Sequence, residues 1–270
     1  MTDTSYEVVA HNSATASENR IHDDEVAASF GFRGGLVPGV DVYAYLCRPV
    51  LDRWGERYLA AGRASTRFER PVFDGEVVRI EHQLDGDGVL RAEAVTAAGP
   101  CAWLRAELVD DPTAAEPAPA PGPVAPLPHP DQRPPASPET LVEGTALGTL
   151  EAGFTPDEAA AYLDEVVDPH SPVAELGLVH PGWLLRFANR VLSSTVLLGP
   201  WIHVGSEIRH LRPVAVGETM SVRGTVERLF ERKGHRFVTL DATVVDSDGA
   251  VRWAATHTAI YQPRQVRTDL

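Results

Sequence analysis

An internal repeat constrains the fold of this 270-residue chain more than any other feature. The pattern Arg-Pro-Val-x-x-Gly-Glu occurs at residues 70–76 and again at 212–218, so every matching position is offset by 142. With nearly the same offset, 143, residues 37–39 (Val-Pro-Gly) correspond to residues 180–182 (His-Pro-Gly), and both open an apolar stretch of helical length. Two matches in the same order, half a chain apart, indicate a duplicated unit.

Each copy of the repeat is followed by alternating β-branched and polar residues, interrupted by Gly and Asp turns. This pattern is typical of antiparallel strands joined by tight turns. The predicted strands cover residues 77–84, 89–97 and 101–109 in the first unit and residues 219–230, 236–245 and 251–261 in the second. Each unit is therefore expected to contain a short N-terminal element, one helix and a meander of about four strands.

The two predicted helices are apolar on almost every face. Residues 182–198 have this character, and residues 39–54 are similar, so both helices should be buried on most sides. Pro49 cannot donate to the carbonyl of Tyr45, and we expect a kink or a break there. A buried helix wrapped by a curved antiparallel sheet is the hot-dog arrangement, which makes the predicted class an α+β double hot-dog. The two units are expected to form one continuous sheet around a pseudo-twofold axis, because pairing covers the edge strand that each would leave exposed.

A proline-rich linker separates the units. Half of the 22 prolines fall within residues 110–138, so residues 112–138 are expected to lack regular secondary structure. At roughly 3 Å per residue this stretch can run about 80 Å. We divide the chain into an N-terminal unit (1–109), a linker (110–140) and a C-terminal unit (141–270).

Composition limits the partners and the compartment. A net charge of -14 and a pI near 5.1 argue against nucleic acid or an anionic membrane as partner, although a local basic pocket for the phosphates of CoA is compatible with an acidic chain. The N-terminus lacks the pattern of a secretory signal, and the sequence has no apolar run of about 18 residues. Two cysteines, Cys47 and Cys101, in apolar surroundings fit buried thiols in a reducing compartment. A cytoplasmic protein is expected.

Residues 19–39, NRIHDDEVAASFGFRGGLVPG, resemble the hydratase segment of MaoC-like proteins, the (R)-specific enoyl-thioester hydratases and dehydratases. In that family an Asp-x-Asn-Pro-aliphatic-His motif precedes a helix of small residues and a Gly entry to the hot-dog helix. Residues 67–76, 154–172 and 209–218 resemble the same family. The resemblance implies a lyase acting on an acyl thioester, with CoA or an acyl-carrier protein as the carrier and no other cofactor.

The resemblance also implies a set of site residues. Asn19 and His22 match the family's Asn and His, whereas the family's catalytic Asp falls on Ser17. Glu18 is the adjacent carboxylate that could take part in its place. The amide of Gly39, at the positive end of the buried helix, is expected to donate to the thioester oxygen. If the missing acid limits catalysis, Ser17→Asp should raise turnover.

Further candidates lie elsewhere in the two units. Tyr43, in the first turns of the helix, fits a core position or a contact with substrate, and His180, before the second helix, is a candidate substrate-binding residue. In the second unit Asp168 and His170 fall on family positions, but Val173 stands at the position of the His. We therefore expect the working site in the first unit, in a narrow tunnel between the halves.

Three functions remain open at this stage. The first is acyl-thioester hydration or dehydration, and the second is a non-catalytic subunit that binds an acyl thioester or another small molecule. The third is a thioesterase, isomerase or cyclase of secondary metabolism, for which Asp41 near the helix start is a candidate base. No metal is expected, because the side chains following His22 point in different directions at the start of a helix. A homodimer and association with another hot-dog chain are both left open.

Overall fold

The structure, a computed structural model, describes residues 4–109 and 116–264. One sheet contains ten strands. In the first unit these are β1 (Thr4–Val9), β2 (Gly62–Phe68), β3 (Val77–Leu84), β4 (Leu90–Thr96) and β5 (Gly99–Leu108). In the second unit they are β6 (Leu150–Gly153), β7 (Ile202–His210), β8 (Thr219–Arg232), β9 (His235–Val245) and β10 (Val251–Gln262).

The strand order is β1-β3-β4-β5-β2-β7-β10-β9-β8-β6, and every neighbouring pair is antiparallel. Read outward from the central β2–β7 pair, the two halves have equivalent strands in the same order. The expected continuous sheet is therefore confirmed, and the order has the symmetry that a pseudo-twofold axis between β2 and β7 would produce. Pairing of β2 with β7 removes the edge that each unit alone would expose.

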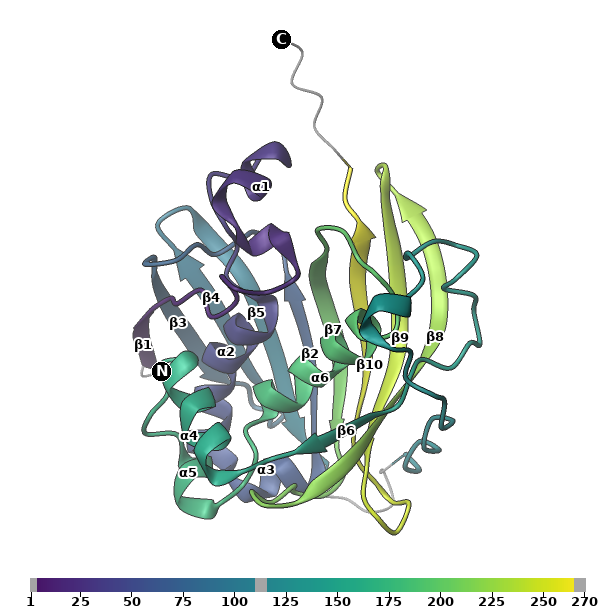
Figure 1. Ribbon diagram of the computed structural model, residues 1–270. Coiled ribbons are helices and arrows are strands. Elements are labelled where there is room, and N and C mark those ends of the chain that lie inside the picture. The colour runs from purple at the N-terminus through teal and green to yellow at the C-terminus, as the bar shows by residue number, and fades with distance from the viewer. Residues whose placement is uncertain (1–3, 110–115, 265–270) are drawn as a thin grey trace.

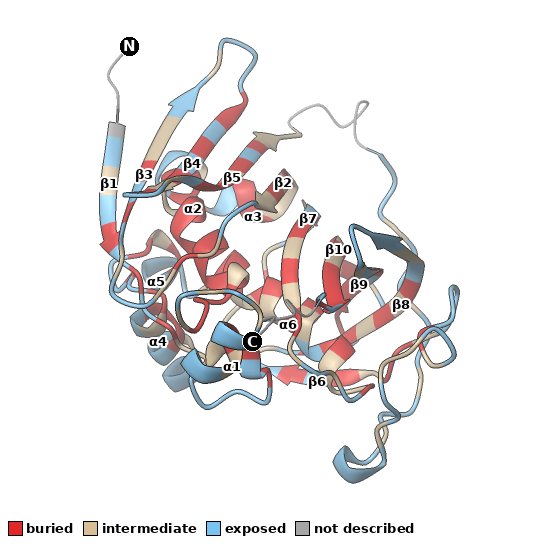
Figure 2. Ribbon diagram, turned by 90° about the horizontal axis from the view of Figure 1, so that it is seen from above, coloured by how far each residue is buried: buried red, intermediate tan, exposed pale blue. Residues whose placement is uncertain are grey.

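Two long helices occupy the concave side of the sheet. The helical segments are η1 (Arg20–His22), α1 (Asp24–Ser29), α2 (Gly39–Trp54), α3 (Glu56–Ala61), η2 (Pro130–Gln132), α4 (Pro156–Glu165), α5 (Pro172–Leu176) and α6 (Pro181–Ser193). Figure 1 shows the sheet curving behind α2 and α6, with α4 and α5 covering their outer side. Buried residues concentrate on α2, α6 and the strands facing them (Figure 2). This is the double hot-dog fold, as predicted.

The expected break in α2 does not occur, since the helix runs through Pro49 without interruption. Proline removes the hydrogen bond that residue 49 would donate to the carbonyl of Tyr45. The hydroxyl of Tyr6, on β1, donates to that same carbonyl instead. A partner from a distant strand thus satisfies the group that proline leaves unpaired.

The helix α4 is capped at its N-terminus, and both cysteines are buried as predicted. Thr155 and Glu158 form a capping box at the start of α4, with Thr155 Oγ1 accepting from the Glu158 amide and Glu158 Oε2 accepting from the Thr155 amide. The second long helix is shorter than expected and ends at Ser193. Cys47 and Cys101 are buried free thiols, and burial raises the pKa of both.

The described part of the linker, residues 116–138, contains η2 and an isolated bridge from Pro135 to Leu197, but neither an α-helix nor a strand. It docks on the second unit through backbone contacts, because Arg209 donates to the carbonyl of Glu116 at 2.7 Å. Residues 110–115 lie outside the described residues. Among the helices of the described chain, none has the length and apolar character needed to cross a membrane.

Candidate active site

A cavity of about 230 Å³ lies at the N-terminus of α2. The loop before α1 and the start of α2 form one side, and β7 with the segment before it forms another. The lining residues used below are Asn19, His22, Gly39, Phe68, Trp201 and His203. Two of these six come from the second unit, so the cavity of the first unit is completed by the second.

His22 is held in one tautomer. Its Nδ1 lies 2.6 Å from the carbonyl oxygen of Leu36, an acceptor, so Nδ1 carries the hydrogen. Nε2 then has a lone pair and accepts from Asn19 Nδ2 at 3.2 Å. Burial lowers the pKa of His22, with a smaller opposing effect from the Leu36 hydrogen bond. The ring is therefore neutral near pH 7 and able to take up a proton.

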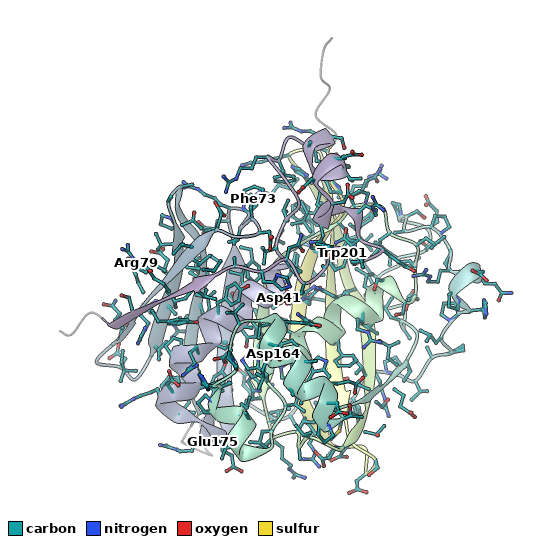
Figure 3. The ribbon with its side chains drawn as sticks, turned by 60° about the vertical axis from the view of Figure 1, so that its left-hand side comes forward. Asp41, Phe73, Arg79, Asp164, Glu175 and Trp201 are labelled. Carbon is teal, nitrogen blue, oxygen red and sulfur yellow. The ribbon has the colours of Figure 1, made fainter. Side chains whose placement is uncertain are left out.

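Asn19 joins this loop to the second unit. Its Oδ1 accepts from the amide of Trp201 at 3.1 Å, and its Nδ2 donates to the carbonyl of Trp201 at 3.0 Å. The same Oδ1 accepts from the amide of Ile21, which begins the turn that presents His22. Figure 3 labels Trp201 on the second-unit side of the molecule. The Asn19 side chain thus positions the His22 loop against the strand that follows Trp201.

Gly39 is the first residue of α2, and first-turn amides have no partner within their helix. The space beside it is narrow, because a Cβ at this position would lie 3.3 Å from His203 Nδ1 and 3.4 Å from the Phe68 ring. The absence of a side chain leaves room for a ligand atom next to the amide. The positive end of the helix favours an atom carrying negative charge there.

The corresponding helix end of the second unit is closed. His180 Nδ1 accepts from the Gly182 amide at 3.0 Å, and a Cβ on Gly182 would collide with the Tyr162 hydroxyl. Burial lowers the pKa of His180 to about 3. This histidine lines a separate pocket of about 520 Å³ with Tyr162 and Trp183. His180, the pocket candidate of the second unit, thus caps its own helix and lines this separate pocket, and it does not line the cavity at Gly39.

Ser17 and Glu18 lie outside the cavity at the α2 N-terminus. Glu18 forms an ion pair with Arg133 of the linker at 2.9 Å, and this contact lowers the pKa of Glu18. Ser17 is exposed, and its hydroxyl accepts from the Asn19 amide at 3.1 Å. Because the Asn19 side chain is fixed inward, the two preceding residues face the linker. The structure therefore does not bring the expected substitute carboxylate to His22.

Tyr43 does not face the cavity either. It is fully buried among the core residues, and burial raises the pKa of its hydroxyl. Val42, one turn after Gly39, lines the cavity instead. Of the two roles considered for Tyr43, the structure therefore supports the core position.

Asp41 connects the two central helices. One carboxylate oxygen accepts from Arg186 of α6 at 2.7 and 3.0 Å, and the other accepts from the Ser13 hydroxyl at 2.5 Å. Burial raises the pKa of Asp41, and Arg186 partly opposes that shift. Figure 3 shows Asp41 in the centre of the molecule. With both oxygens engaged, Asp41 is a structural link between the units and not a free base.

Asp168 and His170 are not brought together. Asp168 is buried and pairs with Arg48 of α2 at 2.5 Å, and its second oxygen lies 3.9 Å from His180 Nε2. His170 is exposed. Within the part of the chain that the structure describes, no group of three or more His, Cys, Asp or Glu side chains is arranged to hold a metal ion.

His203, on β7, is the cavity residue that the sequence reading missed. Its Nε2 lies 2.9 Å from Ser206 Oγ, while its Nδ1 is buried beside Gly39. Burial lowers the pKa of His203 well below its usual value, so the ring is neutral. A signal was present, because the ten residues before Arg-Pro-Val contain two histidines in the second unit, His203 and His210, and none in the first.

Comparisons with known proteins place the fold. Neither a family model nor a curated protein matches the sequence. Among solved structures, a MaoC-like dehydratase aligns with a TM-score of 0.60 at 14% identity, covering 96% of this chain and 98% of that chain. A conserved hypothetical protein from Mycobacterium tuberculosis with a double hot-dog fold aligns with a TM-score of 0.62 at 16% identity, covering 96% of each chain. A provisional oleoyl thioesterase from Lactobacillus plantarum aligns with a TM-score of 0.55 at 13% identity, covering 97% of this chain and 98% of that chain.

These alignments span nearly the whole of each chain, so they concern the complete arrangement of two units and not one domain. The class of protein is a double hot-dog. In particular, the chain has the double hot-dog fold seen in MaoC-like dehydratases.

Proposed function

We propose that this protein is an acyl-thioester hydratase or dehydratase of the MaoC-like type, and that its reaction takes place in the cavity at the N-terminus of α2. The observation that carries the proposal is the difference between the two equivalent helix ends. Gly39 opens onto a cavity that contains the neutral His22, whereas Gly182 is capped by His180. One unit has kept a ligand site at its helix end and the other has closed it.

Hydration of an enoyl thioester needs a base for water, a proton for the α-carbon and donors for the thioester oxygen. As the water oxygen bonds to the β-carbon, the π electrons move toward the thioester oxygen and form an enolate. The Gly39 amide and the positive helix end stabilise that charge. His22 Nε2 takes the proton from water and returns it to the α-carbon, which regenerates the neutral imidazole. Dehydration follows the same steps in reverse.

Asn19 has to share His22 Nε2 with the reacting water. Its Nδ2 contact to that nitrogen is 3.2 Å, longer than the 3.0 Å contact to the Trp201 carbonyl, so it is the weaker of the two. An incoming water can displace it while Asn19 stays anchored to Trp201. Asn19 therefore acts as the residue that positions the loop and shields His22 until substrate enters.

The scarcity of carboxylates among the described lining residues supports a second candidate function, binding of an acyl thioester without reaction. Glu69 is the one carboxylate among the described lining residues, and it accepts from Trp103 Nε1 at 3.2 Å. A thioesterase is less well supported, because Asp41 is held by Arg186 and Ser13.

Turnover of crotonyl-CoA and of (R)-3-hydroxybutyryl-CoA separates these functions. The wild-type protein is expected to interconvert them, and His22→Gln is expected to reduce kcat by about 10²–10⁴-fold, the usual value of one acid–base group. His170→Gln, at an exposed histidine of the second unit, is the matched control and should keep full activity. Binding of crotonyl-CoA without turnover would replace the hydratase proposal with the binding function. Release of free CoA from butyryl-CoA would indicate a thioesterase.

A further inference from the structure

Three buried polar side chains form a connected row between β7 and β10. Ser206 Oγ lies 2.9 Å from His203 Nε2 and 3.0 Å from His257 Nδ1. The two imidazole rings also stack, with centroids 4.1 Å apart. Each of the three side chains is at least nine-tenths buried. Burying three polar groups is unfavourable unless they bond to one another, so this row is a built feature of the second unit.

A β-bulge gives the row its geometry. Opposite the consecutive residues Thr258 and Ala259 of β10, β7 presents Gly205 and His203, so Val204 is an extra residue on β7. Alternation along a regular strand would place His203 and Ser206 on opposite faces. The extra residue brings them onto the same side, which is how bulges redirect side chains near functional sites.

The outer end of the row faces the cavity. His203 Nδ1 has no hydrogen-bond partner among the described residues, and it lies 3.3 Å from the point where a Cβ on Gly39 would be. The Phe68 ring packs against the imidazole at 4.6 Å and holds its orientation. An oxygen bound beside the Gly39 amide is therefore also beside His203 Nδ1. A ligand oxygen at this position would give the buried nitrogen a partner that the hydrogen bonds of the row do not supply.

With a ligand oxygen beside Gly39, the hydrogen bonds of the row favour one tautomer of His203. If Ser206 donates to His203 Nε2, the His203 hydrogen is on Nδ1 and faces the cavity, and His257 donates its Nδ1 hydrogen to Ser206. The opposite direction would place a hydrogen on His257 Nε2, which is buried and unpaired among the described residues. Within the described residues each direction leaves one buried N–H without an acceptor, on His203 Nδ1 or on His257 Nε2. A carbonyl oxygen beside Gly39 would accept from His203 Nδ1–H, so a bound ligand favours the first direction. Burial lowers the pKa of His257 to about 3 and that of His203 well below its usual value, so both rings stay neutral.

We propose that His203 is a second hydrogen-bond donor to the thioester carbonyl oxygen, acting through Nδ1–H beside the Gly39 amide, and that Ser206 and His257 are positioning residues that keep the hydrogen on Nδ1. This assignment rests on the proposed acyl-thioester site. The ligand it takes is the carbonyl oxygen of an acyl thioester, and it requires no change in the charge of His203. A neutral imidazole is suited to this role because it donates without adding a buried charge. The equivalent strand of the first unit, β2, contains no histidine, so the donor belongs to one site alone of the two.

Kinetics test the catalytic part of the proposal. His203→Phe keeps an aromatic ring between Phe68 and His257 but removes both nitrogens, and it is expected to lower kcat on crotonyl-CoA by about 10²–10³-fold, the usual effect of losing one oxyanion donor. KM should change far less, because the bond strengthens as charge develops on the oxygen. Ser206→Ala leaves both imidazoles in place and should give a smaller loss of kcat. Unchanged kcat in His203→Phe would overturn the proposal.

Nitrogen-15 NMR of labelled histidines tests the binding part without turnover. Butyryl-CoA is the probe, since it has the thioester carbonyl but no double bond to hydrate. His203, assigned by the loss of its signals in His203→Phe, is expected as the Nδ1–H tautomer with a proton shift that changes on addition of butyryl-CoA. Ser206→Ala should reduce the Nδ1–H population. An Nε2–H tautomer that persists at saturating butyryl-CoA, or no binding at all, would overturn the proposal.

The two measurements separate this proposal from the proposed reaction. A His203 response to butyryl-CoA in a protein without turnover would support the carbonyl donor and refute the hydratase. Turnover that survives unchanged in His203→Phe would support the hydratase and refute the donor. The NMR titration is made on the wild-type protein, and His203→Gln replaces His203→Phe for the assignment if the latter is too unstable to use.

Discussion

Gly39→Ala is the substitution that most directly challenges the site assignment. The added methyl group would lie 3.3 Å from His203 Nδ1 and 3.4 Å from the Phe68 ring, which fills the space beside the helix amide. A carbonyl oxygen could then no longer reach both donors. Loss of one such donor typically costs about 10²–10³-fold in kcat, or about 2.7–4 kcal/mol of transition-state stabilisation. We expect turnover of crotonyl-CoA to fall by at least that factor.

The same substitution should have little effect on stability. Alanine is better than glycine in a helix by about 1 kcal/mol, and this gain opposes the cost of the two tight contacts. The free energy of unfolding, measured with urea, should therefore change by no more than about 1 kcal/mol. An inactive but stable protein is the expected signature of a lost ligand site.

Two matched glycine variants provide the controls. Gly86→Ala places its methyl group in open space and should change neither activity nor stability. Gly182→Ala directs a methyl group into the Tyr162 hydroxyl at the closed helix end, so it should lower stability while the folded protein stays active. Activity of Gly39→Ala within about threefold of wild type would refute the assignment of the oxygen site. So would a large loss of activity in stable Gly182→Ala.

Three further predictions concern acid stability, the missing acid and the proline in α2. Burial lowers the folded-state pKa of His180 and His257 to about 3, whereas the pKa in the unfolded chain is near 6.5. Because the unfolded chain binds more protons between these values, the free energy of unfolding in urea should fall as pH drops below 6.5, by up to about 1.4 kcal/mol per pH unit for each histidine. A flat profile from pH 7 to 5 would contradict this. Ser17→Asp should change kcat by less than about threefold, because Ser17 is exposed outside the cavity. A tenfold gain in kcat would mean that the loop rearranges to bring the new carboxylate to His22. Tyr6→Phe should lower the free energy of unfolding by about 1–3 kcal/mol, because it leaves the Tyr45 carbonyl unpaired. This loss, measured by urea unfolding, should be smaller in the Pro49→Ala background, where the amide of residue 49 can donate to the same carbonyl. Equal losses in both backgrounds would show that the Tyr6 hydrogen bond is unimportant.

Much of the fold follows from local features of the sequence. The repeated motif with its offset of 142, the strand alternation and the apolar segments after residues 39 and 182 predict two hot-dog units and their elements. The placement of Asn19, His22 and Gly39 around one cavity was also expected, because the loop and the helix start are close in sequence. Short-range signals succeed here because backbone conformation depends mainly on neighbouring residues.

The direction in which individual side chains point depended on contacts between distant segments. Glu18 turns to the linker because Arg133 is there, and Asp41 is occupied because α6 brings Arg186 to it. His180 caps its own helix, whereas Val37, at the matching position of the first unit, has no polar side-chain group that could do so. Each of these partners is more than 100 residues away or differs between the copies, so the motif alone carried no information about it.

The composition of the cavity was decided by the pairing of β2 with β7. That pairing joins the two units and places Trp201 and His203 of the second unit against the helix start of the first. The bulge at Val204 then turns His203 and Ser206 to the same side. In the sequence alone, a single histidine in a predicted strand cannot be distinguished from any other polar residue of the alternating polar and apolar pattern. Its partners across the sheet become neighbours only when the backbone hydrogen bonds between strands set the register, because the register determines which face each side chain occupies.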